Sequence, residues 1–283
     1  MPEGDTVYRT AARLRTALLD RVLTKGELRH PRLSTVDLAG RVVVGARTVG
    51  KHLFLRFDRD LSLRSHLGMD GAWDVYAPRG RWRRPAHQVR AHLVNAEHQV
   101  VGFNLHEMAL VPTAEEDRLV AHLGPDLLDP AWGPELAAEA QARLTADPAR
   151  ELGLALLDQR VMAGVGNVYK AEICHILRVS PWSPVSAVSA AEAVELARDL
   201  LERNKLRVDR CTTGDTRRGR ELWVYGRRRT PCLRCGGAVV AGVQGADVRE
   251  RVAYFCPVCQ PGPRGGADPG ARAQTPRATV RYL

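Results

Sequence analysis

The sequence predicts an α+β protein of several domains: an N-terminal helix with a β-sandwich, then a helical domain, then a small ribbon built on cysteines. Three observations predict this fold class. Apolar residues first recur at helical spacing, then alternate with period two as far as residue 112, and then return to helical spacing. Two closely spaced cysteine pairs follow near the end. The chain has 283 residues, 45% of them hydrophobic, which is enough for two or three modest cores.

The first helix is predicted over 6–19, with Asp5 or Thr6 available as its N-cap, because four apolar residues share one face: Val7, Ala11, Leu14 and Leu18. Short strands follow, separated by glycines and Pro78, and they indicate a sandwich or a barrel up to about residue 112. They are expected at 42–44, 53–57, 61–63, 73–75, 91–94 and 100–101.

The middle of the chain is predicted to be helical, with helices near 114–123, 134–144, 148–158, 167–177 and 190–203. Capping boxes at 113–116 and 189–192 mark two helix starts, and Asp147 before Pro148 marks a third. The glycines of the segment 162–167 forbid a continuous helix and expose backbone amides. We therefore expect domains at 1–112, 113–225 and 226–262, followed by a disordered tail at 263–283.

The charge of the chain indicates a polyanionic partner. Its net charge is +10 with a pI near 9.8, and the stretch 203–229 alone holds ten basic and three acidic residues. Such clustering favours a phosphate-binding surface, and nucleic acid is the commonest partner of that kind. No apolar run is long enough to cross a bilayer and no signal peptide is evident, so we expect a soluble, cytoplasmic protein with no membrane partner.

The four cysteines of the ribbon are spaced as zinc ligands: Cys232, Cys235, Cys256 and Cys259. The spacing predicts one structural Zn²⁺, since four protein ligands leave no position for a catalytic water. Two disulfides are the alternative, but no secretion signal accompanies them. Two further cysteines, Cys174 and Cys211, are expected to be free thiols.

The N-terminus is a candidate nucleophile. If Met1 is removed, Pro2 presents a secondary amine followed directly by the carboxylate of Glu3. An α-amino group has a pKa near 8, and the positive end of the following helix lowers that pKa further. Attack of such an amine on C1′ of a sugar yields a cationic iminium that serves as an electron sink.

Six motifs in order resemble the formamidopyrimidine-DNA glycosylase and endonuclease VIII family, and within it an actinobacterial-type endonuclease VIII. They are Pro-Glu-Gly-Asp-Thr at 2–6, Gly-Lys-His at 50–52, the segment 65–71, Gly-Val-Gly-Asn at 164–167, the segment 212–219 and the cysteine ribbon. The resemblance covers residues 2 to 260. It implies a helix-two-turns-helix motif in the helical domain. It also implies a monomeric, nucleoid-associated, bifunctional glycosylase that flips a damaged base out of duplex DNA, excises it, and cleaves the strand by β,δ-elimination.

The resemblance also implies the roles of individual residues. Pro2 would be the Schiff-base nucleophile, Glu3 the general acid and base, and Lys51 a phosphate-binding residue beside the lesion. A strand-end lysine in solvent is the alternative for Lys51, although lysine is rare in this chain, with 38 arginines against four lysines.

Three DNA contacts are implied as well. Asn167 would donate to the DNA backbone, with the nearby amides adding to an anion site, or would serve as a helix cap. Arg251 would grip phosphates around the flipped nucleotide, with Arg249 as the alternative. Met69 would fill the space left by the flipped base, or be a buried core residue.

Substrate preference follows from two departures from the 8-oxoguanine branch of the family. The opening is Pro-Glu-Gly-Asp-Thr, and the Asp-x-Arg-Arg-Phe-Gly loop is replaced by the segment 103–108. Oxidised pyrimidines such as thymine glycol are therefore favoured. The alternatives are a purine-selective glycosylase and a non-catalytic protein that binds damaged DNA. Three histidines lack metal-ligand spacing and are expected to be structural: His66, His92 and His106.

Overall fold

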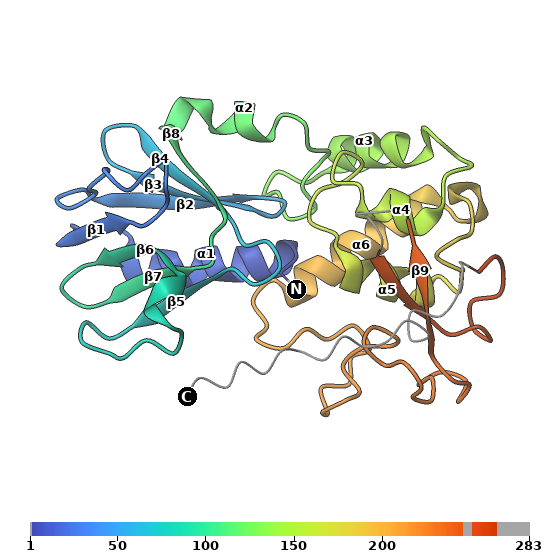
Figure 1. The fold of residues 1–283 in the computed structure, drawn as a ribbon. Coiled ribbons are helices and arrows are strands. Elements are labelled where there is room, and N and C mark those ends of the chain that lie inside the picture. The colour runs from blue at the N-terminus through green and yellow to red at the C-terminus, as the bar shows by residue number, and fades with distance from the viewer. Residues whose placement is uncertain (1, 246–250, 265–283) are drawn as a thin grey trace.

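A computed structural model describes residues 2–245 and 251–264. The described chain forms two lobes, with a β-rich lobe at one end, a helical lobe with a small ribbon at the other, and the N-terminus between them (Figure 1). The tail expected to be disordered, 263–283, lies outside the described residues beyond position 264.

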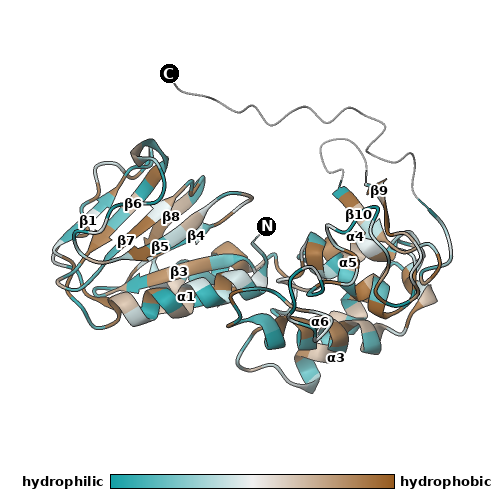
Figure 2. Cartoon of the chain, turned by 90° about the horizontal axis from the view of Figure 1, so that it is seen from below, coloured by the Kyte–Doolittle hydropathy of each residue, from teal (hydrophilic) through white to brown (hydrophobic). Residues whose placement is uncertain are grey.

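The β-rich lobe is the predicted sandwich. Two antiparallel four-stranded sheets, in the orders β1-β6-β7-β5 and β2-β3-β4-β8, share one core with helix α1, Gly4–Leu18. All four apolar residues predicted to face inward from this helix are buried, and α1 lies next to β3 (Figure 2). The strands are β1 Lys25–Leu28, β2 Val43–Val49, β3 His52–Phe57, β4 Leu61–His66, β5 Ala72–Tyr76, β6 Val89–Val94, β7 Gln99–Phe103 and β8 Glu107–Pro112.

Three details of this lobe differ from the sequence prediction. Helix α1 begins at Gly4, its N-cap is Glu3, and no side chain caps it, so neither Asp5 nor Thr6 has that role. Strands β1 and β8 were not predicted. The segment Lys-Gly-Glu-Leu of β1 has too few apolar residues for an alternating pattern, and its pairing with β6 alone places it in the sheet.

The helical lobe has its own core, and its helices are α2 Glu116–Val120, α3 Pro134–Thr145, α4 Leu152–Leu157, α5 Asn167–Ile176 and α6 Ala190–Asn204. Short 3₁₀ turns lie at 86–88, 113–115 and 185–187. Helix α5 lies at the centre, since all its residues from Asn167 to His175 are buried. An amphipathic helix has a solvent face, and α5 has none over that span.

The predicted helix starts had different outcomes. The side chain of Ser189 accepts a hydrogen bond from the backbone of Glu192, which confirms Ser189 as the N-cap of α6. The first capping box is wrong, because Thr113 bonds Ser62 instead. The prediction at Pro148 is also wrong, because 147–150 forms turns and α4 begins only at Leu152.

The ribbon carries a short hairpin of β9 Val240–Gln244 and β10 Arg251–Phe255, paired antiparallel. Strand β10 packs against α5, and Trp182 meets Phe255 edge to face at a centroid distance of 5.1 Å. Within the described residues, no helix is long and apolar enough to cross a membrane.

Candidate active site

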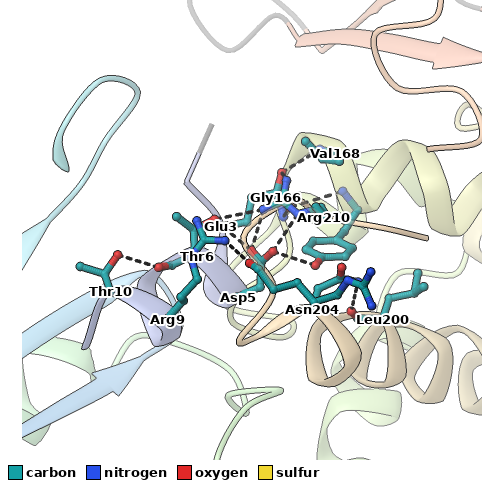
Figure 3. A network of polar contacts seen from close by, with 12 residues as sticks. Glu3, Asp5, Thr6, Arg9, Thr10, Gly166, Val168, Leu200, Asn204 and Arg210 are labelled. Carbon is teal, nitrogen blue, oxygen red and sulfur yellow. Dashed lines mark hydrogen bonds and ion pairs between the residues drawn. The ribbon is translucent and has the colours of Figure 1, made fainter. Parts of the chain in front are cut away.

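The carboxylate of Glu3 is fully buried at the N-terminus of α5 (Figure 3). The backbone N–H groups of Gly166 and Val168 each donate to it at 2.8 Å, and that of Tyr169 donates at 3.3 Å. The first amides of a helix have no partner within the helix and favour a negative charge. The sequence predicted that amides of this turn would add to an anion site, and the anion that occupies them is the protein's own carboxylate.

Close packing makes a glycine necessary at position 166. A Cβ built on Gly166 would lie 2.5 Å from Cδ and 2.8 Å from Oε1 of Glu3. The neighbouring backbone is tied as well, since the Gly4 N–H donates to the carbonyl of Gly164 at 2.9 Å. The start of α1 is therefore fixed against the turn before α5.

A second polar cluster holds the first turn of α1 (Figure 3). Arg210 donates to both oxygens of Asp5, from Nε at 2.8 Å and from Nη2 at 2.6 Å. The hydroxyl of Tyr169 donates to Asp5 at 2.9 Å, and the guanidinium lies 4.7 Å from the centre of the Tyr169 ring. Arg210 also lies 4.0 Å from Oε1 of Glu3. Burial, together with the charge of Asp5, raises the pKa of Tyr169 well above its ordinary value, so the phenol stays protonated and donates.

Lys51 lies in the two-residue turn between β2 and β3, where Val49 pairs with His52. Gly50 has φ of +55°, which a two-residue hairpin turn requires at this position, and its N–H donates to Asp126 at 3.0 Å. Burial lowers the pKa of Lys51, and the charge of Glu3 opposes this effect. The turn therefore places Lys51, a residue of the sandwich lobe, close enough to Glu3 for the Glu3 charge to affect the Lys51 pKa.

The rarity of lysine is a useful guide to the site. Lys170 is fully buried on α5, and burial lowers its pKa to about 8, again opposed by the charge of Glu3. The other two lysines are surface residues in ion pairs, Lys25 with Glu27 and Lys205 with Glu202. Two of the four lysines thus lie near Glu3, although sequence reasoning gave a role only to Lys51.

Asn167 is the first residue of α5, and it is not the helix cap, because Gly166 occupies that position and no side chain caps the helix. The side-chain amide of Asn167 donates to the carbonyl of Val252 at 2.9 Å. Its Oδ1 is buried with no hydrogen-bond partner among the described residues. The atom of this amide that lacks a partner is therefore a hydrogen-bond acceptor.

Arg251 precedes Val252 at the start of β10, and its side chain is exposed. The positive charge of Arg251 helps to lower the pKa of both Lys51 and Lys170, so Arg251 lies near these two lysines. Arg249, the alternative, lies outside the described residues.

Met69 lies in the turn between β4 and β5 with 72% of its surface exposed, which excludes the core interpretation. Nδ1 of His66 accepts a hydrogen bond from the N–H of Gly68 at 3.2 Å and supports this turn.

His92 is buried beside Gln99, while His106 faces Asp70 at 3.5 Å. The histidine that sequence reasoning missed is His52, buried next to Lys51 with its ring 5.1 Å from that of His66.

The basic stretch 203–229 is fixed to α5 by Glu172. This buried carboxylate accepts N–H bonds from Trp223 at 2.7 Å, Val224 at 3.0 Å and Tyr225 at 2.9 Å, and a hydroxyl bond from Thr212. Several arginines of the stretch are exposed: Arg203, Arg207, Arg217, Arg218, Arg220 and Arg229. The stretch therefore presents an exposed basic surface from an anchored backbone.

The four ribbon cysteines meet in one cluster, with all four sulfur atoms within 4.8 Å of one another. Cys232 and Cys259 are 3.9 Å apart, Cys235 and Cys256 are 3.5 Å apart, and none is in a disulfide. Tetrahedral zinc with Zn–S bonds of about 2.3 Å requires sulfur atoms about 3.8 Å apart. The cluster therefore fits a tetrahedral metal ion. Cys174 and Cys211 are free thiols, as expected.

Comparison with known proteins gives consistent matches. Residues 1–162 match the model of the formamidopyrimidine-DNA glycosylase N-terminal domain, and residues 123–213 match that of the formamidopyrimidine-DNA glycosylase H2TH domain. A probable endonuclease 8 2 of Streptomyces coelicolor is 51% identical over 96% of this chain and 99% of its own. A protein of Mycolicibacterium smegmatis named DNA-(apurinic or apyrimidinic site) lyase Nei2 is 47% identical over 92% of this chain and 99% of its own.

Among solved structures, the formamidopyrimidine-DNA glycosylase of Lactococcus lactis, bound to DNA with an AP site, has a TM-score of 0.75. It is 21% identical, and the match covers 92% of this chain and all of that one. At this level of identity the likeness establishes the fold. The fold of this chain agrees with the predicted fold class in the order of its parts: helix and sandwich, helical domain, cysteine ribbon.

Proposed function

Since the chain belongs to the formamidopyrimidine-DNA glycosylase and endonuclease VIII family, we propose that it excises oxidised pyrimidines from duplex DNA and cleaves the strand at the resulting abasic site. Its similarity to the Streptomyces and mycobacterial proteins puts it with the actinobacterial-type endonuclease VIII. In this proposal, residues 1–112 supply the chemistry, and 113–225 and 226–262 hold the DNA. The observation that carries the proposal is the buried Glu3 carboxylate, fixed by α5 directly after Pro2.

The proposed reaction begins with the free amine of Pro2, after removal of Met1. Its nitrogen bonds C1′ as the bond from C1′ to the base breaks. The amine proton passes to the Glu3 carboxylate, and the base leaves with the electron pair of the broken bond and takes a proton from water. A proton from Glu3 opens the sugar ring at O4′ and leaves the iminium. The Glu3 carboxylate then takes a proton from C2′, and the electron pair expels the 3′ phosphate. A second elimination, in which C4′ loses a proton to water, expels the 5′ phosphate. Water then hydrolyses the iminium and frees the Pro2 amine.

The surroundings of Glu3 suit the second proton transfer. Three amide donors stabilise the carboxylate and fix its position, which limits the reorganisation needed during the reaction. Lys51 lies close enough to Glu3 for the Glu3 charge to raise its pKa against the effect of burial, and we assign to Lys51 the phosphate next to the lesion. Asn167 and Arg251 extend that phosphate contact from α5 and β10.

Met69 is proposed as the residue that fills the space of the flipped base. Its exposure on a tight turn supports this role, because an unbranched apolar side chain in solvent can enter the base stack without unfolding the lobe. Preference for oxidised pyrimidines rests on the short connection between β7 and β8, residues 104–106, where the 8-oxoguanine branch has its characteristic loop.

Borohydride trapping on abasic DNA tests the nucleophile. We expect a covalent adduct with the wild-type protein and none with Pro2→Thr. A Lys51→Ala variant should still trap, although more slowly, and Lys25→Ala serves as the matched control because Lys25 is in a surface ion pair. An adduct that persists in Pro2→Thr would reassign the nucleophile to a lysine, with Lys51 first. Retention of Met1 in an active protein, detected by mass spectrometry, would also refute the proposal.

Cleavage of duplexes that carry thymine glycol or 8-oxoguanine tests the substrate. Faster cleavage of the thymine glycol duplex is the expected result. Preference for 8-oxoguanine would indicate a purine-selective enzyme. Tight binding to both duplexes without cleavage or trapping would indicate a non-catalytic protein that binds damaged DNA.

The cysteine cluster is proposed to hold one structural Zn²⁺, which would stabilise the ribbon's small core. Metal analysis should find one zinc per chain. Cys256→Ser should lose the metal and bind DNA more weakly, whereas Cys211→Ser should keep both properties, because Cys211 lies outside the cluster. Normal DNA binding by a zinc-free protein would refute this role.

A further inference from the structure

A histidine of α5 contacts the cysteine cluster. Nε2 of His175 lies 3.4 Å from Sγ of Cys232, and both residues are buried. The His175 ring is stacked on Trp223 at a centroid distance of 5.3 Å and an interplanar angle of 24°. His175 is not part of the four-sulfur cluster, so it is positioned to act on a ligand and not on the metal itself.

The environment of the ring determines where its proton lies. Nδ1 is buried and has no hydrogen-bond partner among the described residues. A proton on Nδ1 would leave a buried N–H unpaired and would turn the Nε2 lone pair toward an electron-rich sulfur. A proton on Nε2 instead makes an N–H···S hydrogen bond to Cys232.

A second link joins the same two parts of the chain. The backbone N–H of Arg234 approaches Sγ of Cys232 at 3.5 Å, and Nη1 of Arg234 donates to the carbonyl of His175 at 2.8 Å. The Arg234 guanidinium also lies 5.2 Å from the centre of the ring of Trp223, the same tryptophan that stacks on His175. The end of α5 and the first cysteine pair are therefore held together from both sides.

We propose that His175 is a positioning residue of the metal centre: it donates from Nε2 to the Cys232 thiolate and couples the ribbon to α5. The inference rests on the zinc assignment above. A donor to a bound thiolate stabilises its charge and slows release of the metal. Helix α5 runs about 13 Å from His175 back to Gly166, at about 1.5 Å per residue. The same rigid element thus joins the cysteine cluster to the amides that hold Glu3.

Two substitutions separate the hydrogen bond from packing. His175→Phe keeps a planar ring against Trp223 and removes the donor, whereas His175→Gln restores an N–H donor at similar reach. His92→Phe is the matched control, because it removes a buried histidine of the sandwich lobe. The full-length zinc protein is mixed with a chromogenic chelator, and the cobalt-substituted protein is used for absorption spectra.

We expect His175→Phe to release zinc roughly 10- to 100-fold faster than wild type and to shift the thiolate-to-cobalt charge-transfer band. His175→Gln should recover most of both properties, and His92→Phe should change neither. Hydrogen exchange of the peptide 165–170 should be faster in zinc-loaded His175→Phe, because the amides that hold Glu3 lie there.

Two results would overturn the inference in distinguishable ways. A wild-type protein that binds no zinc would remove the zinc assignment and this inference with it. A wild-type protein with one zinc, and a His175→Phe variant with unchanged release, spectrum and exchange, would refute the role of His175 alone and leave the zinc assignment intact.

Discussion

Replacing Gly166 by alanine tests whether the N-terminus of α5 positions Glu3. The backbone at Gly166 has φ −129° and ψ −162°, an extended conformation that alanine adopts without strain. The effect must therefore come from the added Cβ, which would lie 2.5 Å from Cδ and 2.6 Å from Cγ of Glu3. Ordinary carbon contacts are about 3.5 Å, so the Glu3 side chain must retreat by roughly 1 Å.

That displacement sets the size of the expected effect. It weakens the two 2.8 Å hydrogen bonds from Gly166 and Val168. Hydrogen bonds to a charged group contribute about 1.5–3 kcal/mol each. A misplacement of about 1 Å in a reacting group can cost about 100-fold in rate. We expect Gly166→Ala to slow excision and trapping by about that factor and to lower the melting temperature.

Single-turnover excision measures the effect, and Gly133→Ala provides a matched control. Gly133 is also a helix N-cap with extended backbone, φ −154° and ψ −170°, and its Cβ would meet only the carbonyl of Ala131 at 3.8 Å. The control should excise at the wild-type rate. Equal rates and equal melting temperatures for Gly166→Ala and wild type would refute the claim that α5 positions the carboxylate.

Three further predictions follow from the same contacts. Arg210→Met should destabilise the protein by about 3–5 kcal/mol in urea unfolding, because it leaves Asp5 charged and buried. Arg217→Met should cost at most about 1 kcal/mol, because the Arg217 side chain is 75% exposed. Equal losses of stability in the two variants would refute a special role for Arg210. Burial lowers the pKa of Lys51, and the Lys51 charge is present only below that pKa. As the pH rises, DNA binding by the wild-type protein should therefore weaken earlier than DNA binding by Lys51→Arg. Identical pH profiles of binding for the two proteins would contradict this expectation. Met69→Ala should change stability by less than about 0.5 kcal/mol but slow excision from duplex DNA. Met108→Ala should cost about 2–5 kcal/mol of stability, because Met108 is buried. Normal excision by Met69→Ala would refute the proposal that Met69 fills the space of the flipped base.

The parts of the fold that sequence could predict depend on local pattern. Periodicity located α1, most strands and all the longer helices within a few residues, and the cysteine spacing predicted the four-sulfur cluster. Cap assignments at Asp5 and Thr113 failed for one physical reason: a side chain that can cap a helix can also bond a distant partner. The assignment at Pro148 failed because α4 begins later, at Leu152. Asp5 bonds Arg210, which lies 205 positions away, and Thr113 bonds Ser62.

The residues of the candidate site likewise include some that the sequence could predict and others that it could not. Glu3 and Lys51 could be found from motifs, and the structure brings both to one neighbourhood. Arg210 could not, because within a stretch of ten basic residues nothing in the sequence distinguishes the one that pairs with Asp5. His52 belongs to the Gly-Lys-His motif, but nothing in the sequence gives it a role beyond that of a strand residue. Only the packing of the two lobes brings Arg210 to Asp5.

Helix α5 explains why the site depends on the whole assembly. Three of its polar residues each contact a different part of the chain: Tyr169 bonds Asp5 of α1, Glu172 anchors the basic stretch, and His175 meets Cys232 of the ribbon. Each would be costly to bury without its partner, so the helix is stable only when all three segments are docked. Because the N-terminus of α5 holds Glu3, the geometry of the proposed chemistry is complete only when the DNA-holding surfaces are also in place.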